Sequence, residues 1–232
     1  MFVPYVGIVH DLNDIWALYA SYTKIFNPQP TRYRDINYLP LDPEEGISYE
    51  AGVKASFYDG RLNASLSLYK TDLDNKAAWY SGSDRTIYYT ADGTETEGVE
   101  FEINGELAEG WQLATGYSYN DIRDRNDDRL VTFVPMHRFK LFSTYRLPGA
   151  FNKITIGGGV DWRSNRKYGS DTLSSFAVAN AMTRYDISEN LSASLHVKNL
   201  FDKKYLEEFN QNFQTGMYGM PRSFMVSLKY NY

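Results

Sequence analysis

The chain has no cysteine and no long apolar run, and each absence excludes a class of protein. Without cysteine among its 232 residues there is no disulfide framework, thiolate metal site or cysteine nucleophile. No run approaches the roughly 18 apolar residues that a membrane helix needs, which excludes helical membrane proteins. The mean hydropathy of −0.49 is typical of soluble proteins, although strands of alternating polar and apolar residues would average to the same value.

Basic charge, histidine pairs and nucleophile motifs are also scarce. The net charge is −5, so no broad basic surface argues for nucleic acid as a partner. The histidines His10, His137 and His196 lie far apart without metal-ligand spacing, and no G-x-S-x-G motif is present. The glycines at 157–159 lack a following helix, so they form no phosphate cradle; they suit a bend in a strand or the close approach of a neighbour. The sequence therefore predicts neither an enzyme nor a resident cofactor.

Alternation of polar and apolar residues runs through almost the whole chain, and helical spacing occurs almost nowhere. In the last segment, for example, Phe224, Val226 and Leu228 alternate with more polar residues. This period of two is typical of strands with one buried face, so the sequence predicts an all-β chain. Eleven such segments are found, near 2–12, 15–26, 47–58, 61–73, 86–107, 111–122, 136–147, 152–164, 175–187, 190–201 and 221–232.

The connections between these segments alternate between short and long. The short ones lie at 12–14, 58–60, 108–110, 148–152 and 188–190, and the long ones at 27–46, 72–85, 123–135, 165–174 and 202–220. Short turns at one rim and long loops at the other are typical of an antiparallel transmembrane β-barrel of the outer membrane. A soluble β-sandwich gives no reason for such a regular alternation.

Aromatic residues recur on the apolar face beside the short turns. They are Trp16, Phe57, Trp111, Tyr145, Tyr185 and Tyr232. Six strands with a ring at the same rim indicate the aromatic girdle of a membrane–water interface, with outer-membrane lipid as the partner of this face. The charged face would then line a watery interior, where we expect His137 and His196; the alternative is the solvent face of a soluble sheet.

Several stretches resemble one family in the order in which they stand. They are "LYASYTKIFNPQ" (18–29), "ISYEAGVKASFYDGRLNASLSLYK" (47–70), "TEGVEFEINGELAEGWQLATGYSY" (96–119), "VPMHRFKLFSTYRLPG" (134–149), "NLFDKKY" (199–205) and "YGMPRSF" (218–224). Over essentially its whole length, 1–232, the chain resembles the C-terminal part of a TonB-dependent siderophore receptor of the ferric-hydroxamate and ferripyoverdine type. The resemblance implies a 22-stranded barrel with a plugged lumen, of which this chain holds about half the strands.

The strand count agrees with a partial barrel. Bacterial single-chain barrels have an even number of strands, whereas eleven are predicted here, and the start "MFVPYVGIVHDL" is no signal peptide. An open sheet would also leave two unpaired edges in lipid. We therefore expect a truncated or split gene product, an incomplete gene reading or an excised piece. Its expected partners are the missing N-terminal barrel half and, through the missing N-terminal plug region, TonB.

Aromatic and basic residues of the long loops and strand ends are the candidate ligand site. The candidates are Trp79, Tyr80, Tyr88, Tyr89, Trp162, Arg163, Tyr168, Phe209, Phe213 and Tyr218. Rings give a bulky chelate a large contact area at little entropic cost, and Arg balances an anionic complex. The resemblance implies that upper barrel walls and outer loops bind the ligand from above. Alternatively some rings form an upper girdle, above all Trp162, whose parity matches Ile154 and Val160.

The function expected from the resemblance is uptake of a ferric siderophore, with iron present only in the chelate. Alternatives are a TonB-dependent receptor for another bulky nutrient (haem, cobalamin or a glycan) and a β-rich surface module that binds carbohydrate. An outer-membrane enzyme would need a Ser/His/acid arrangement, which the sequence does not show. The run "DIRDRNDDR" (121–129) lacks the EF-hand spacing for calcium and is expected to be a charged extracellular loop.

Overall fold

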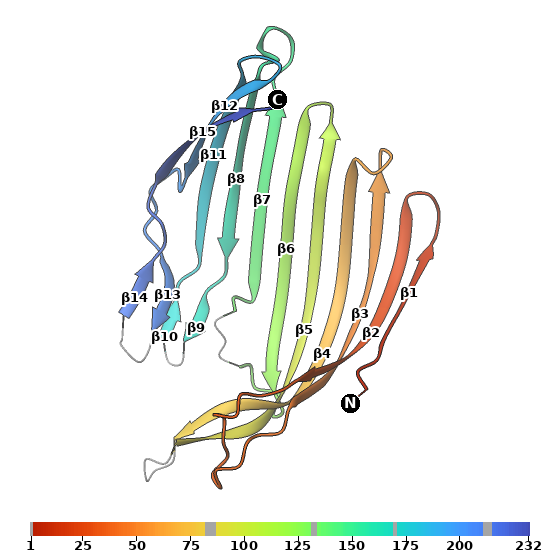
Figure 1. Cartoon of the computed structure of the whole chain (residues 1–232), viewed down its shortest axis with the longest axis vertical. Coiled ribbons are helices and arrows are strands. Elements are labelled where there is room, and N and C mark those ends of the chain that lie inside the picture. The colour runs from red at the N-terminus through yellow and green to blue at the C-terminus, as the bar shows by residue number, and fades with distance from the viewer. Residues whose placement is uncertain (1, 82–86, 131–133, 169–170, 211–214) are drawn as a thin grey trace. The chain divides into compact units, whose positions relative to one another are not determined.

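The computed structural model describes residues 2–81, 87–130, 134–168, 171–210 and 215–232 (Figure 1). Eleven strands form one sheet in which neighbours in the sheet follow chain order, and every pair whose register is described runs antiparallel. The strands are β1 (Tyr5–Asp11), β2 (Trp16–Asn27), β3 (Glu44–Phe57), β4 (Leu62–Ser81), β5 (Ile87–Ala108), β6 (Trp111–Asp124), β7 (His137–Arg146), β8 (Ile154–Arg163), β11 (Phe176–Asp186), β12 (Leu191–Lys198) and β15 (Ser223–Tyr230). All eleven predicted segments are thereby confirmed.

Two further pairs of short strands lie outside this sheet. β9 (Arg166–Tyr168) pairs with β10 (Asp171–Leu173), and β13 (Leu206–Asn210) pairs with β14 (Thr215–Tyr218). Both pairs lie within the predicted long connections 165–174 and 202–220. The sequence did not reveal them, because strands of three to five residues are too short to show an alternation.

Helical structure in the described part of the chain is confined to one short segment. A single 3₁₀ turn (Gly149–Phe151) lies between β7 and β8. No helix among the described residues is both long and apolar enough to span a membrane.

The chain divides into two compact units, and each is described by itself. Unit 1 comprises Met1–Lys54, Leu66–Val99 and Asn120–Leu130. Unit 2 comprises Ala55–Ser65, Glu100–Tyr119 and Val131–Tyr232. The aromatic and basic candidates whose side chains are described all lie in unit 2.

Strand register in unit 2 separates an apolar face from a polar face. Leu141 of β7 lies opposite Val160 of β8, which lies opposite Ala179 of β11. One residue along, Lys140 lies opposite Asp161. Because side chains alternate between the faces of a sheet, the apolar and charged rows point in opposite directions.

The described side chains on the apolar face of β15 are exposed. In β15, Val226 is 72% and Leu228 is 73% exposed. Among the described residues no large side chain is fully buried, and the buried apolar residues are Ala55, Leu173, Phe176 and Val178. A sheet in water must bury its apolar face against another layer, so this face suits a lipid environment.

Aromatic rings mark the turn end of this face. Trp111 of β6 lies opposite Tyr145 of β7, and its Nε1–H donates a hydrogen bond to Ser143 Oγ at 2.8 Å. Tyr185 of β11, 48% exposed, lies opposite Ile154 at the same end of β8. An exposed ring with a polar handle is the usual arrangement at a membrane–water interface, as the sequence predicted for these strands.

The triple glycine lies inside β8, as predicted, and allows its neighbours to approach closely. A Cβ atom at Gly157 would lie 2.9 Å from the carbonyl oxygen of Ser143, and one at Gly159 would overlap the backbone of Leu141. The pairing of β7 with β8 therefore leaves no room for a side chain at Gly157 or Gly159.

Candidate ligand-binding site

Six of the ten candidate residues have no described side chain. The backbones of Trp79, Tyr80, Tyr88 and Tyr89 lie in the far ends of β4 and β5, that of Tyr168 ends β9, and Phe213 lies outside the described residues. The remaining four are Trp162, Arg163, Phe209 and Tyr218, and all belong to the loop end of unit 2. The geometry of the candidate site therefore rests on these four residues and their neighbours.

Trp162 lies on the apolar face. It is opposite Phe139 of β7 and Ala177 of β11, in the same row parity as Val160. Its ring centroid is 6.5 Å from that of His137. This position matches its alternative role as an upper girdle residue and sets it apart from Arg163, the next residue in the strand.

His137 is on this same face, so the prediction that it lines the polar interior is wrong. Its Nδ1 atom lies 2.8 Å from the hydroxyl of Tyr117, and its ring lies 5.0 Å from that of Tyr119. His137 shares the parity of Phe139 in β7, and its position in the strand, rather than its polarity, determines the face on which it lies. His196, by contrast, lies beside Ser194 Oγ at 3.2 Å, on the polar face.

Arg163 ends β8 on the polar face, and its side chain is only 10% exposed. Its Nη1–H donates to Glu207 Oε1 at 2.9 Å, and its Nη2–H groups donate to the carbonyl oxygens of Glu207 at 3.0 Å and Leu206 at 3.4 Å. Its Cζ atom also lies 4.1 Å from the ring centroid of Phe176. A buried guanidinium is stable only with partners of this kind, which here come from β13 and β11.

Two residues that the sequence analysis missed complete this cluster. Arg166 of β9 donates a second guanidinium hydrogen bond to the carbonyl of Glu207. The ring of Tyr205 lies 4.0 Å from that of Phe176, and burial raises the pKa of the Tyr205 hydroxyl. Tyr205 is the last residue of the "NLFDKKY" motif. That motif is the sequence feature that could have indicated a role for Tyr205.

Asn199, at the start of the same motif, fixes the chain that leads into this cluster. It is 2% exposed, and its Nδ2–H groups donate to the carbonyls of Lys203 at 2.9 Å and Met220 at 3.1 Å. Its Oδ1 accepts from the Lys203 amide at 2.8 Å. Further on, Asp202 Oδ1 accepts from the Arg222 amide at 2.9 Å. The motif thus joins the segment that follows β12 to the segment that precedes β15, on either side of the β13–β14 hairpin in the chain.

Phe209 and Tyr218 lie on that hairpin. Phe209 of β13 is half-buried and opposite Gly216, whereas Tyr218 of β14 is 67% exposed and opposite Leu206. Figure 1 shows β13–β14 beside β9–β10 near the end of β8, and β10 contacts β13. The structure therefore brings Arg163, Phe209 and Tyr218 to one end of unit 2.

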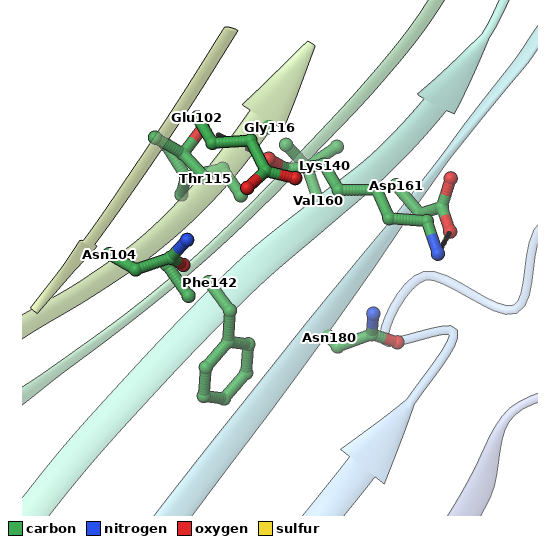
Figure 2. Close-up of a pocket in the computed structure, with 11 residues that line it drawn as sticks. Glu102, Asn104, Thr115, Gly116, Lys140, Phe142, Val160, Asp161 and Asn180 are labelled. Carbon is green, nitrogen blue, oxygen red and sulfur yellow. Dashed lines mark hydrogen bonds and ion pairs between the residues drawn. The ribbon is translucent and has the colours of Figure 1, made fainter. Parts of the chain in front are cut away.

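The polar face of unit 2 carries a separate hollow of about 410 Å³. Figure 2 shows the Lys140 side chain extending to Asp161, with Glu102 at the opposite margin. Lys140 Nζ lies 3.4 Å from Asp161 Oδ2, and Gly116 lines the hollow together with Glu102 and Lys140. Charges of both signs around an open hollow suit a polar partner or water and favour no single small ligand.

The charged run of unit 1 pairs mostly with itself. Asp121, whose side chain is 11% exposed, accepts from Arg123 at 3.0 Å and lies 3.4 Å from Arg129. Arg123 also pairs with Asp127 at 3.1 Å. Among the described residues no group of acidic and histidine side chains is arranged to hold a metal ion.

Comparison with known proteins gives the family. A family model described as "TonB dependent receptor-like, beta-barrel" matches residues 1–200. The chain belongs to this family. TonB-dependent receptors of this kind are outer-membrane proteins, and the membrane assignment of the apolar face follows from the family as well as from the fold.

Relatives that match the whole chain include ferric-pyoverdine receptors. The "Ferric-pyoverdine BN7/BN8 receptor" of Pseudomonas putida is 47% identical over 236 residues, which cover 100% of this chain and 28% of the relative. The "Ferripyoverdine receptor" of Pseudomonas aeruginosa is 39% identical, covering 100% of this chain and 30% of the relative. A solved structure of the pyoverdine outer-membrane receptor of that species, bound to pyoverdine, aligns with a TM-score of 0.90 at 36% identity, covering 99% of this chain and 36% of that one.

The chain spans about three-tenths of the length of the curated relatives it matches. The family consists of receptors and transporters rather than enzymes. What the relatives bind as whole proteins is therefore a starting point for a proposal about this chain.

Proposed function

We propose that this chain serves as part of an outer-membrane receptor for a ferric siderophore of the pyoverdine class, taken up in a TonB-dependent way. The observation that carries the proposal is the identity of 39–47% with two ferric-pyoverdine receptors over the whole chain. Iron enters only as the chelate, so the residues have to recognise the organic shell and the net charge of the complex. No bond is made or broken in this role.

The loop end of unit 2 supplies suitable chemistry for that recognition. Tyr218 is exposed and Phe209 half-exposed on the same hairpin. Planar rings bind a flat chromophore or chelate with little loss of side-chain entropy. The candidates Trp79, Tyr80, Tyr88, Tyr89, Tyr168 and Phe213 remain predictions of the sequence. Trp162 has the weakest claim, because it lies in register with the apolar face.

Residues 1–232 are proposed to be the C-terminal part of the receptor barrel. The remaining strands, the plug and the TonB-contacting segment would then come from sequence that this chain does not include. An immunoblot of outer membranes with an antibody to residues 203–220 tests this. A band several times heavier than 26.7 kDa is expected; a salt-resistant band at that mass would contradict the proposal.

Binding of iron-55-loaded pyoverdine to outer membranes tests the ligand class. Membranes from cells that make the polypeptide should bind the ferric complex saturably, and membranes from cells lacking it should not. Haem, cobalamin and ferrioxamine B serve as competitors. Displacement by haem or cobalamin instead of by ferripyoverdine would favour a receptor for another bulky nutrient, and a detergent-independent soluble polypeptide would favour a carbohydrate-binding module.

A further inference from the structure

The Arg163–Glu207 pair is unusual in its setting, because a strand-end arginine is buried by a hairpin that lies outside the main sheet. Every described hydrogen bond of the Arg163 guanidinium goes to Leu206 or Glu207. Its face contacts Phe176. The guanidinium is therefore already occupied by protein groups and has its charge balanced by the Glu207 carboxylate.

A bulge explains why Glu207 is available for this role. Leu206 lies opposite Tyr218 and Glu208 lies opposite Met217, so Glu207 has no partner in the β13–β14 register. Bulges commonly redirect a side chain and leave one residue's backbone unpaired. Here the free carbonyl of Glu207 accepts from both Arg163 and Arg166, while its carboxylate pairs with Arg163.

We propose that Arg163 is a positioning residue for the ligand site and does not contact the ligand. Together with the bulged Glu207 it fixes the base of the β13–β14 hairpin on the end of β8, and so determines where Phe209 and Tyr218 stand. The inference rests on the proposed function, since it assigns a role within the same site. It also revises the sequence-based view of Arg163 as the counter-charge of an anionic chelate.

The two roles predict opposite effects of one substitution. If Arg163 contacted an anionic ligand, Glu207→Gln would remove a competing carboxylate and strengthen binding. If Arg163 positions the hairpin, Glu207→Gln loosens the pair and weakens binding. If the hairpin occupies its binding position only about a tenth of the time, the apparent Kd for the ferric siderophore rises about tenfold. Arg163→Lys should weaken binding similarly, because an ammonium cannot reproduce the forked hydrogen bonds.

The experiment measures the Kd of iron-loaded pyoverdine in outer membranes containing the polypeptide as its cells make it. Arg163→Gln, Glu207→Gln and the double variant are compared with the wild type. Positioning predicts that both single variants weaken binding and that the double variant is no worse than either, because the residues act as one unit. Tighter binding by Glu207→Gln, or additive losses, would overturn it.

Arg138→Gln is the control for a general effect of removing positive charge. Arg138 lies opposite Arg163 in register but pairs with Asp161. An equal loss of binding in Arg138→Gln would indicate a diffuse charge effect and overturn the positioning role.

A second measurement does not depend on the ligand. These 232 residues contain no cysteine, so Met217→Cys, at a position that is 56% exposed on β14, places a single thiol among them for a spin label. Glu207→Gln and Arg163→Gln should increase the mobility of that label, and Arg138→Gln should leave it unchanged. Unchanged mobility in all variants would overturn the inference. If the wild type fails to bind ferripyoverdine, the proposed function fails while this readout still decides the role of Arg163.

Discussion

The ring of Tyr19 lies directly against Gly52, on the polar face of the neighbouring strands β2 and β3. A Cβ atom at Gly52 would come 2.6 Å from Tyr19 Cε1 and 2.6 Å from the carbonyl oxygen of Leu66. The Tyr19 hydroxyl donates to Glu50 Oε1 at 2.5 Å, and Lys54 Nζ lies 4.6 Å from the ring centroid. Glu50 and Lys54, two residues before and two after Gly52, thus hold the Tyr19 ring over the glycine. The ring covers the backbone where Gly52 has no side chain of its own.

Gly52→Ala is therefore expected to damage this part of the sheet. The new methyl group must displace both the ring and a backbone carbonyl, and overpacking of this kind costs roughly 1–3 kcal/mol. Outer membranes are heated to a series of temperatures and then run on a gel without further heating. The measurement is the temperature at which the band moves from the position of the folded protein to that of the unfolded protein. Gly116→Ala is the control, because the nearest atoms there lie 3.8 Å and 3.9 Å away. Equal melting of the two variants would contradict the packing argument.

Asn199→Ala is expected to lower the stability of the segment between β12 and β15. It removes the partner of two carbonyls and one amide at a site that is 2% exposed, and a buried polar group left unpaired costs about 1–3 kcal/mol. The readout is protease cleavage within 199–222 in intact outer membranes. Asn190→Ala should have no effect, since Asn190 lies in an exposed turn and accepts a hydrogen bond from the Asn231 amide through its backbone carbonyl, which the substitution keeps. Protection of the Asn199→Ala protein equal to wild type would refute the anchoring role.

Most of the fold follows from the sequence because a strand that faces lipid on one side and water on the other must alternate strictly. That constraint placed all eleven strands and, in unit 2, put the turn-end rings Trp111, Tyr145 and Tyr185 on the apolar face. It failed at the ends. β4 runs to Ser81 although the alternation predicted an end at 73, because strands beyond a membrane no longer need an apolar face.

The site was less predictable, because its geometry comes from contacts between distant segments. Arg163 and Glu207 are 44 residues apart, and no local pattern links them. The bulge that frees Glu207 depends on the register of a hairpin with strands of four and five residues. Residue type alone suggested that Arg163 binds a ligand; only its burial and its partners show that its hydrogen bonds are already taken.

The orientation of β15 gives a direct test of which face meets lipid. Val226 and Ser227 are adjacent near the middle of the strand and point to opposite faces. Val226→Arg should cost about 2–4 kcal/mol, the range for a basic residue on the lipid face near the bilayer centre, whereas Ser227→Arg should be nearly neutral. Urea unfolding of the protein refolded in lipid vesicles measures both. A larger loss for Ser227→Arg would reverse the assignment of the faces.

Tyr218 is the described candidate best placed to touch a ligand, because it is 67% exposed on the hairpin that Arg163 holds. Tyr218→Ala should weaken ferripyoverdine binding about tenfold, or about 1.4 kcal/mol, which is within the range for one aromatic contact. Tyr218→Phe should keep most of the affinity if the ring face, rather than the hydroxyl, makes the contact. Tyr230→Ala is the matched control, since this ring is 63% exposed but lies on β15 opposite Leu191. Should Tyr218→Ala bind as tightly as wild type, the contact surface would have to lie on the other long loops, and the hairpin would serve another purpose.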